Sequence, residues 1–339
     1  MNNFDYTRAT AAKDAVNQLA SSSDNQLIAG GTNLIDLWKY NLVHPAKLVD
    51  INGIDALKEI KETANGGLSL GALVSNSTTA HHPLVKERYP LLSRTILAGA
   101  TAQIRNAATN GGNLMQRTRC HYFYDATSPC NKRNPGSGCP AVKGHNRLSA
   151  ILGHSDQCIA VFPSDMCIAL AALEATVHVT GPAGDRSIPF ADFHRLPGNQ
   201  PELDNNLKDN ELITSIELPP EGYATNYSYL KLRDRNSYAF AMVSVATGLK
   251  LENNKITKAR IALGGVAHIP WRVPAAEEFL TGKSPTPENF AAAADLILAG
   301  AQGFEHNSFK IEAARRAIIR NGAMALDPAC QRPGAPPSL

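Results

Sequence analysis

The 339-residue chain is long enough for two or three domains with sizeable cores. Its composition, 43% apolar and 19% charged, excludes a disordered protein and favours a globular one. No apolar run reaches about 18 residues, and the N-terminal segment lacks a basic region followed by an apolar one. We therefore expect neither membrane insertion nor a signal peptide, and the net charge of +3 is too mild to suggest nucleic acid.

The first 55 residues alternate between helix and strand. Periodicity predicts helices over Ala11–Ala20 and Leu34–Tyr40 and strands over Gln26–Ala29 and Lys47–Ile51. We predict a first subdomain over residues 1–55 on this basis.

From residue 56 the pattern becomes richer in strands. Leu57–Thr63 and Leu68–Leu73 flank a glycine turn and predict a hairpin. Two helices ending near Ala98 follow, and Gln103–Thr109 is predicted as a strand that enters a second glycine turn. After a long irregular loop, we predict a helix over Asp165–Ala175, a hairpin turn at 181–184 and a strand over Glu211–Leu218.

Pro219-Pro220 marks the predicted end of the second subdomain, residues 56–221. The C-terminal domain, 222–326, is predicted to hold three strands followed by three helices. The strands lie at about 227–234, 241–252 and 256–267, and the helices at about 274–281, 287–299 and 308–325. The tail, 327–339, has four prolines in thirteen residues and is predicted to be disordered.

Two turns carry paired glycines with small polar neighbours. The first is Leu27-Ile28-Ala29-Gly30-Gly31-Thr32-Asn33-Leu34 and the second is Thr109-Asn110-Gly111-Gly112-Asn113. Glycines allow close approach to a phosphate, and successive N–H groups cradle it. Together the turns suggest a clamp for one diphosphate, with two unrelated tight turns as the alternative. The dinucleotide fingerprint GxGxxG is absent, so a Rossmann site is not indicated.

Five of the six cysteines cluster between residues 120 and 167. They are Cys120, Cys130, Cys139, Cys158 and Cys167, and Cys330 stands alone. The first four lack the close Cys-x2–4-Cys pairs of zinc sites, and their wide spacing on an irregular loop suits a [4Fe–4S] cluster. We expect Cys167 to be a buried, inert thiol and Cys330 to be no ligand. A surface loop with free or paired thiols is the alternative.

The same loop is basic. Residues 117–147 hold six cations against Asp125 alone, a local net charge of +5 that leaves −2 for the rest of the chain. The cations are Arg117, Arg119, Lys132, Arg133, Lys143 and Arg147. We expect them to stabilise an anionic four-thiolate cluster. Elsewhere, Ser164-Asp165 fits a helix N-cap and Lys231 belongs to a charge run that is solvated by default, although it could meet an anion or a flavin edge. No hydrolase motif is present.

Over residues 1–325 these motifs together resemble the FAD-binding subunit of molybdenum hydroxylases, the xanthine dehydrogenase and carbon monoxide dehydrogenase family. The resemblance implies an α+β fold. A two-part FAD-binding domain of the vanillyl-alcohol-oxidase (PCMH) type would precede a C-terminal domain with a three-stranded antiparallel sheet and helices. The FAD diphosphate would lie on the 30–33 and 111–113 turns.

The same resemblance places four residues nearest the flavin. Thr109 and Asp165 would hydrogen-bond it, Ile213 would pack on it, and Lys231 would stabilise its anionic reduced form. None of them would be a catalytic acid or base.

The loop insertion, residues 115–160, is longer than in most relatives. It resembles the flavin subunit of periplasmic aldehyde oxidoreductases, which, like that of 4-hydroxybenzoyl-CoA reductase, carries an extra [4Fe–4S] cluster. By this resemblance the cluster ligands are Cys120, Cys130, Cys139 and Cys158.

The implied function is electron transfer within a heterotrimer. A large molybdenum-cofactor subunit would oxidise an aldehyde to a carboxylic acid, and a small subunit with [2Fe–2S] clusters would pass electrons through FAD here to an external acceptor. The alternatives are a stand-alone flavin oxidase of the same fold, the flavin subunit of a 4-hydroxybenzoyl-CoA reductase-like enzyme, and a non-catalytic metal-loop scaffold. We expect periplasmic location by co-export with a partner, with a cytoplasmic location as the alternative.

Overall fold

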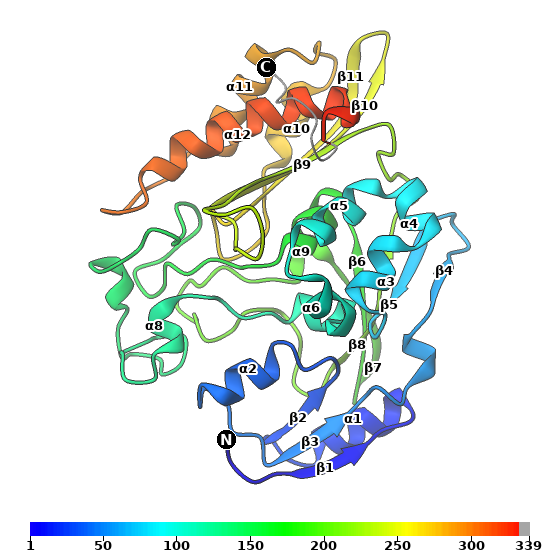
Figure 1. The fold of residues 1–339 in the computed structure, drawn as a ribbon, viewed down its shortest axis with the longest axis vertical. Coiled ribbons are helices and arrows are strands. Elements are labelled where there is room, and N and C mark those ends of the chain that lie inside the picture. Colours follow the sequence, from blue (N-terminus) through cyan, green and yellow to red (C-terminus); the bar gives the residue numbers. More distant parts are fainter. Residues whose placement is uncertain (332–339) are drawn as a thin grey trace.

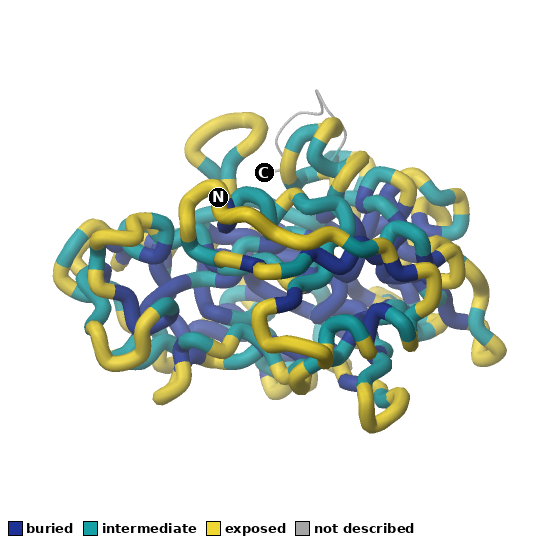
Figure 2. The backbone as a smooth tube through the Cα atoms, turned by 90° about the horizontal axis from the view of Figure 1, so that it is seen from below, coloured by how far each residue is buried: buried dark blue, intermediate teal, exposed yellow. Residues whose placement is uncertain are grey.

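The computed structural model describes residues 1–331, in which three sheets lie one beyond another along the long axis of the molecule (Figure 1). The parallel N-terminal sheet occupies one end, and the C-terminal sheet with its three helices occupies the other. Figure 2 shows that the buried backbone runs through the interior while the exposed segments are mostly turns and loops at the rim. No helix of the described chain is long and apolar enough to cross a membrane.

The N-terminal sheet has three parallel strands in the order β1-β3-β2. The strands are β1 (Asp5–Arg8), β2 (Asn25–Ile28) and β3 (Lys47–Asp50), accompanied by α1 (Ala12–Ala20) and α2 (Leu34–Lys39). Strand β1 was not predicted because its side chains are mostly exposed, so it lacks the alternation of a half-buried strand. Its backbone nevertheless pairs with β3, whose Val49 is buried against Ala15 and Val16 of α1.

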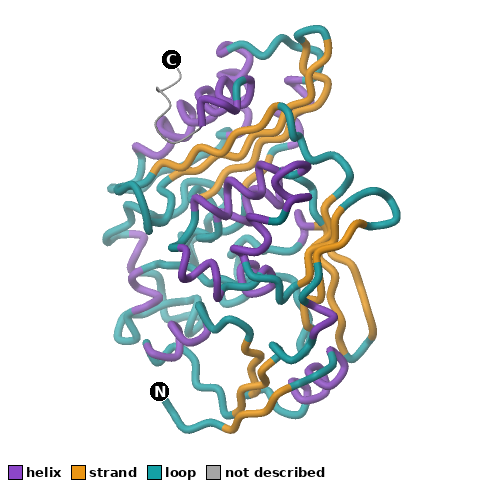
Figure 3. Tube along the Cα trace, turned by 45° about the vertical axis from the view of Figure 1, so that its right-hand side comes forward, coloured by secondary structure: helices purple, strands orange, loops and turns teal. Residues whose placement is uncertain are grey.

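The middle of the chain forms a five-stranded antiparallel sheet in the order β4-β5-β8-β6-β7. These strands are β4 (Ile60–Glu62), β5 (Leu68–Gly71), β6 (Thr176–Gly181), β7 (Gly184–Pro189) and β8 (Leu212–Leu218). The helices packed around it are α3 (Asn76–His81), α4 (Pro83–Arg88), α5 (Pro90–Ala98), α6 (Ala102–Ala107), α7 (Asn110–Leu114) and α9 (Asp165–Ala172), with short 3-10 turns η1 (Asp55–Leu57) and η3 (Phe190–Asp192). Figure 3 shows these helices gathered beside the sheet. Both predicted hairpins are confirmed, as the pairs β4–β5 and β6–β7.

The predicted strand over Gln103–Thr109 is wrong. The segment belongs to α6, and the second glycine turn is itself the start of α7. Each helix begins with a threonine cap: the Thr101 hydroxyl accepts from the Ile104 N–H at 3.3 Å, and the Thr109 hydroxyl accepts from the Gly112 N–H at 3.2 Å. These caps stabilise short helices in a segment whose composition resembles a strand.

The C-terminal sheet is antiparallel, as predicted, but has four strands in the order β12-β11-β10-β9 instead of three. The strands are β9 (Asn226–Leu232), β10 (Val243–Glu252), β11 (Lys255–Gly264) and β12 (Trp271–Arg272), covered by α10 (Pro274–Leu280), α11 (Pro287–Ile297) and α12 (Phe309–Leu326). Strand β12 has two residues, too few for a periodic pattern. The α+β fold class is confirmed. In the predicted disordered tail, Pro328–Gln331 form the 3-10 turn η4, and residues 332–339 lie outside the described residues.

The 115–160 insertion is irregular, as its composition suggests. It contains only α8 (His121–Tyr124) and the 3-10 turn η2 (Pro140–Val142) within long loops. It lies to one side of the molecule, between α2 and the C-terminal helices (Figure 1). The insertion is nevertheless well packed, since Phe123, Ala141 and Ile151 are almost fully buried.

Candidate cofactor sites

A cavity of about 430 Å³ opens between the N-terminal sheet and the central sheet. All eight residues of the first glycine turn line it, together with four further predicted site residues. The lining residues among those predicted are Leu27, Ile28, Ala29, Gly30, Gly31, Thr32, Asn33, Leu34, Thr109, Gly111, Gly112 and Ile213. The structure thus brings both glycine turns, about eighty residues apart in sequence, to one largely apolar cavity.

The two turns approach each other at Gly30, which packs against the end of α6, just before the second turn. A Cβ atom added at this glycine would lie 1.8 Å from the carbonyl oxygen of Ala107, at the end of α6. No side chain fits in that space, so a glycine is required for the turns to approach each other. Gly31 contributes differently, because its φ of +71° lies in the left-handed region that glycine tolerates best.

The two turns differ in their free hydrogen-bond donors. Within the described residues, the backbone N–H groups of Gly31, Thr32 and Asn33 donate to no protein acceptor. In the second turn, by contrast, the Gly111 N–H donates to the Ala72 carbonyl at 2.8 Å, and that of Gly112 donates to the Thr109 hydroxyl. The first turn can therefore bind an anion with its amides, whereas the second shapes the opposite wall.

Asn113 does not line the large cavity. Its side-chain N–H donates to Asn76 Oδ1 at 2.6 Å, and its Oδ1 accepts from Ser164 Oγ at 2.5 Å and from Gln116 Nε2 at 2.9 Å. Asn113 therefore fixes α7 against α3 and the start of α9.

Asp165 and Lys231 lie together but outside the large cavity. They form an ion pair of 2.8 Å whose side chains are 10% and 5% exposed, respectively. The Tyr229 hydroxyl donates to Asp165 at 2.5 Å, and burial together with this carboxylate raises the Tyr229 pKa well above its ordinary value. Asp165 lines a second cavity of about 260 Å³. The predicted N-cap is confirmed at Ser164, whose hydroxyl accepts a hydrogen bond from the Cys167 N–H.

The four cysteines that the resemblance assigns to a cluster gather around one small cavity. Cys120, Cys130, Cys139 and Cys158 all line it, although they span 39 residues of sequence. Cys120 also lines the 260 Å³ cavity that contains Asp165. Cys167 is fully buried in the core of α9, as predicted, and Cys330 lies in η4.

Burial dominates the chemistry of these thiols. It raises the pKa of Cys158 to about 12 and raises the pKa values of Cys120 and Cys139 as well. Backbone N–H groups oppose the rise, from Ala160 beside Cys158 and from Phe123 and Tyr122 beside Cys120. Thiols surrounded by backbone donors and shielded from water suit an iron–sulfur cluster, which binds them as thiolates. Within residues 1–331, no three His, Cys, Asp or Glu side chains are close enough to hold a single metal ion.

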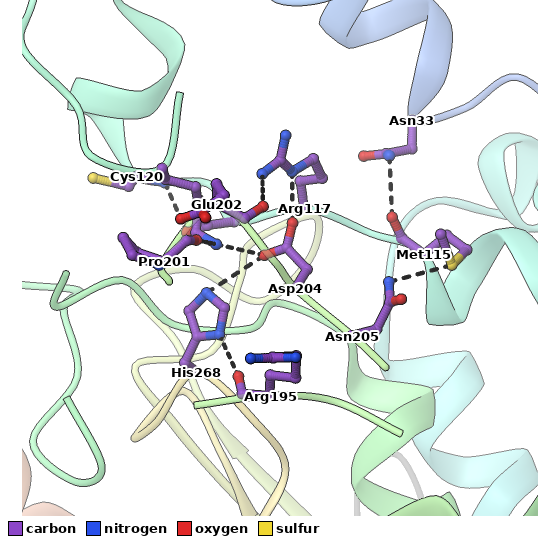
Figure 4. Close-up of polar contacts among 12 residues, drawn as sticks. Asn33, Met115, Arg117, Cys120, Arg195, Pro201, Glu202, Asp204, Asn205 and His268 are labelled. Atoms are coloured by element: carbon purple, nitrogen blue, oxygen red, sulfur yellow. Dashed lines mark hydrogen bonds and ion pairs between the residues drawn. The ribbon is translucent and has the colours of Figure 1, made fainter. Parts of the chain in front are cut away.

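A buried charge network connects the cysteine cavity to the large cavity. The Asp204 carboxylate forms ion pairs of 2.6 Å with both Lys132, which lines the cysteine cavity, and Arg117, which lines the large one. His268 approaches Asp204 at 3.4 Å (Figure 4). Although burial opposes ionisation of Asp204, Arg117, Lys132 and His268 hold its pKa below the ordinary value, and burial lowers the His268 pKa to about 4.

Neither Asp204 nor His268 was predicted from the sequence, because each lies at least 72 residues from Lys132 and belongs to no local motif. Three cations of the basic loop have partners away from the cysteine cavity. Arg119 pairs with Asp36 at 2.6 Å, Arg147 pairs with Asp234 at 2.8 Å, and the guanidinium of Arg133 donates to backbone carbonyls. Of the six cations in this segment, Lys132 alone lines the cysteine cavity.

Comparisons with known proteins match both parts of the chain to described families. Residues 2–221 match the family described as the FAD binding domain in molybdopterin dehydrogenase, and residues 227–307 match the CO dehydrogenase flavoprotein C-terminal domain. The chain is 44% identical to the aldehyde oxidoreductase FAD-binding subunit PaoB of Escherichia coli (strain K12), an alignment that covers 94% of this chain and 96% of the relative. It is 28% identical to the glyceraldehyde dehydrogenase medium chain of Sulfolobus acidocaldarius, covering 83% and 82%.

Solved structures share the fold. Carbon monoxide dehydrogenase from Hydrogenophaga pseudoflava matches with a TM-score of 0.75 and 26% identity, covering 96% of this chain and 97% of that one. Quinoline 2-oxidoreductase from Pseudomonas putida 86 matches with a TM-score of 0.74 and 26% identity, covering 97% and 98%. The chain therefore belongs to the family of FAD-binding subunits of molybdenum hydroxylases, and it is an oxidoreductase subunit.

Proposed function

We propose that this chain is the flavin and iron–sulfur subunit of a heterotrimeric, molybdenum-dependent aldehyde oxidoreductase. It would carry electrons from the [2Fe–2S] clusters of a small partner to an external acceptor, after a large molybdenum-cofactor partner has oxidised the aldehyde. The observation that carries the proposal is the amide-bearing first turn on the wall of the large cavity, in a chain 44% identical to an aldehyde oxidoreductase FAD-binding subunit.

The residues of the large cavity suit FAD. When bound, FAD supplies the conversion between one-electron and two-electron transfer. The free N–H groups of Gly31, Thr32 and Asn33 would bind its anionic diphosphate, because consecutive amides form an anion site. Ile213, 5% exposed on the cavity wall, would pack on an apolar surface, and Thr109 retains its hydroxyl hydrogen for donation after accepting from Gly112.

Asp165 and Lys231 would hold the polar edge of the flavin. They lie in the neighbouring region that joins the central sheet to the C-terminal sheet, where the ion pair fixes both side chains. A lysine in this position supplies positive charge against a reduced, anionic ring, and Asp165 holds the amine in place. We also propose Asn113 as a residue that positions α7.

We further propose that Cys120, Cys130, Cys139 and Cys158 hold a [4Fe–4S] cluster, whose chemistry when bound is one-electron transfer. Their gathering at one buried cavity supports this assignment. Cys130→Ser is expected to remove most of the iron and the broad absorbance near 400 nm. Cys167→Ser, a change at a buried thiol outside the cavity, is the matched control and should keep its iron. Equal iron in both variants would contradict the ligand assignment.

The proposed reaction requires the partners. We expect the chain to co-purify with a molybdenum-containing subunit and a [2Fe–2S] subunit, and the complex to oxidise aldehydes with a dye as electron acceptor. The isolated chain, loaded with FAD, should not oxidise aldehydes. Aldehyde turnover by the isolated chain would instead identify a stand-alone flavin oxidase.

The location of the complex is a separate proposal. We propose export to the periplasm in folded form, carried by a partner that has a twin-arginine signal. Cell fractionation should find the chain in the periplasm only when that partner is expressed. Retention in the cytoplasm alongside an exported partner would contradict co-export.

A further inference from the structure

Lys132 occupies an unusual position beside the cysteine cavity. Its side chain is 1% exposed, and the residue lines the cavity together with the four cysteines. The Nζ atom donates to Asp204 Oδ1 and to the Pro201 carbonyl, both at 2.6 Å. Two short contacts from a single buried atom fix the ammonium group in one place.

The charge of Lys132 reaches the cysteines. Lys132 follows Cys130 by two residues and lines the same small cavity as all four cysteines, so its buried positive charge lies close to them and is poorly screened by water. Three other cations of the segment are directed elsewhere, to Asp36, Asp234 or backbone carbonyls, and none of the other five lines the cysteine cavity. Lys132 is therefore the cation of this segment whose charge acts from the cavity wall.

Asp204 determines how strongly that charge acts. Its carboxylate is shared between Lys132 and Arg117, so it compensates each of them in part. His268, also in contact with Asp204, adds no charge near neutral pH because burial lowers its pKa to about 4. Removing Lys132 takes away one positive charge, and removing the Asp204 charge adds one net positive charge.

We propose that the buried Lys132 ammonium, held in place by Asp204, raises the reduction potential of the [4Fe–4S] centre in the cysteine cavity. This inference rests on the cluster proposed above. Reduction adds one negative charge to the cluster, and a fixed cation in a poorly screened interior stabilises that added charge. Lys132 is a positioning residue in this sense, because it acts through its field and ligates no iron.

Three variants of the assembled complex test the proposal: Lys132→Met, Lys132→Arg and Asp204→Asn. The midpoint potential of the cluster is measured by a redox titration followed by electron paramagnetic resonance. For K132M we expect a lower potential, by at least a tenfold change in the reduction equilibrium constant, which is about 59 mV for one electron. K132R should stay near the wild type, and D204N should shift upward.

Opposite shifts in K132M and D204N distinguish an electrostatic role from a structural one, because loosening of the loop would move both variants in the same direction. An unchanged potential in iron-replete K132M, or shifts of the same sign, would overturn the proposal. If K132M loses its cluster, the D204N result decides: an upward shift supports the proposal and any other result refutes it. Absence of iron from the wild type would instead refute the proposed cluster itself.

Discussion

The two candidate cofactor cavities are built by different means. The large cavity lies between regular elements, and the donors that it leaves free are backbone amides of the first turn, which packs against the end of α6. The cysteine cavity lies in an irregular insertion, and buried side-chain charges hold its walls. The free amides of the first turn are consecutive in sequence, whereas the charges around the cysteine cavity come from residues far apart in the chain. The region around Asp165 is a third case, where a single buried ion pair joins helix α9 to strand β9 of the C-terminal sheet.

The largest expected effect comes from breaking the buried ion pair between Asp165 and Lys231. Lys231→Met leaves the Asp165 carboxylate buried with only Tyr229 as a side-chain partner, and loss of one member of a buried pair costs about 3–5 kcal/mol. Urea unfolding should show a loss of this size in the free energy of unfolding. Lys250→Met, in the neighbouring strand, breaks an exposed pair with Glu221 and should cost under about 1 kcal/mol. Equal effects of the two changes would contradict the assigned importance of the Asp165 pair.

A smaller effect is expected at the contact between the glycine turns. Gly30→Ala would place a methyl group 1.8 Å from the Ala107 carbonyl oxygen, so the turns must separate, at a cost of about 1–3 kcal/mol. Flavin content should fall together with the melting temperature. Gly112→Ala is the milder comparison, since its methyl would meet only the Thr109 hydroxyl, at 3.0 Å. Wild-type flavin content in G30A would show that contact between the turns is not required for FAD binding.

The smallest effect concerns Glu211, on the wall of the large cavity. Arg186 donates to both of its carboxylate oxygens at 2.7 Å and, as the main cause, holds the Glu211 pKa below its ordinary value. A carboxylate with a lowered pKa adds stability that is present above its unfolded pKa and disappears as the pH falls through its folded pKa. Glu211→Gln should therefore cost about 1 kcal/mol at pH 7 and progressively less below about pH 4.

Unfolding of the wild type and E211Q from pH 7 down to pH 3 measures this effect. The two stability curves should approach each other as the pH falls. A constant difference across the range would mean that packing, and not the charge, accounts for the loss.

What could be predicted from the sequence follows the same division between the two cavities. The first turn and its neighbouring strand were predicted because glycines and apolar residues stand together in sequence. Residues 102–114 were misjudged because Thr101 and Thr109 cap helices too short to show a period. In the insertion, cysteine spacing suggested a shared cluster site, but the local charge of +5 did not reveal that Arg119 and Arg147 pair with carboxylates elsewhere.

The partners of Lys132 illustrate the limit. Asp204 and Pro201 reach it from about seventy residues away, and no local pattern marks either of them. Long-range contacts of this kind depend on the whole fold, so single-sequence periodicity carries no signal for them. The two-residue strand β12 was missed for the related reason that pairing with β11, and not its own pattern, defines it.

Two separate cofactor sites in one chain are the central claim, and joint flavin and iron quantitation tests it most directly. We expect the wild-type complex to hold, on this chain, one FAD and about four iron atoms beyond those of its partner's clusters. Cys139→Ser should lose that iron and keep its FAD, because the cysteine lines only the smaller cavity. Loss of FAD and iron together in this variant, or zinc with no flavin in the wild type, would contradict the account.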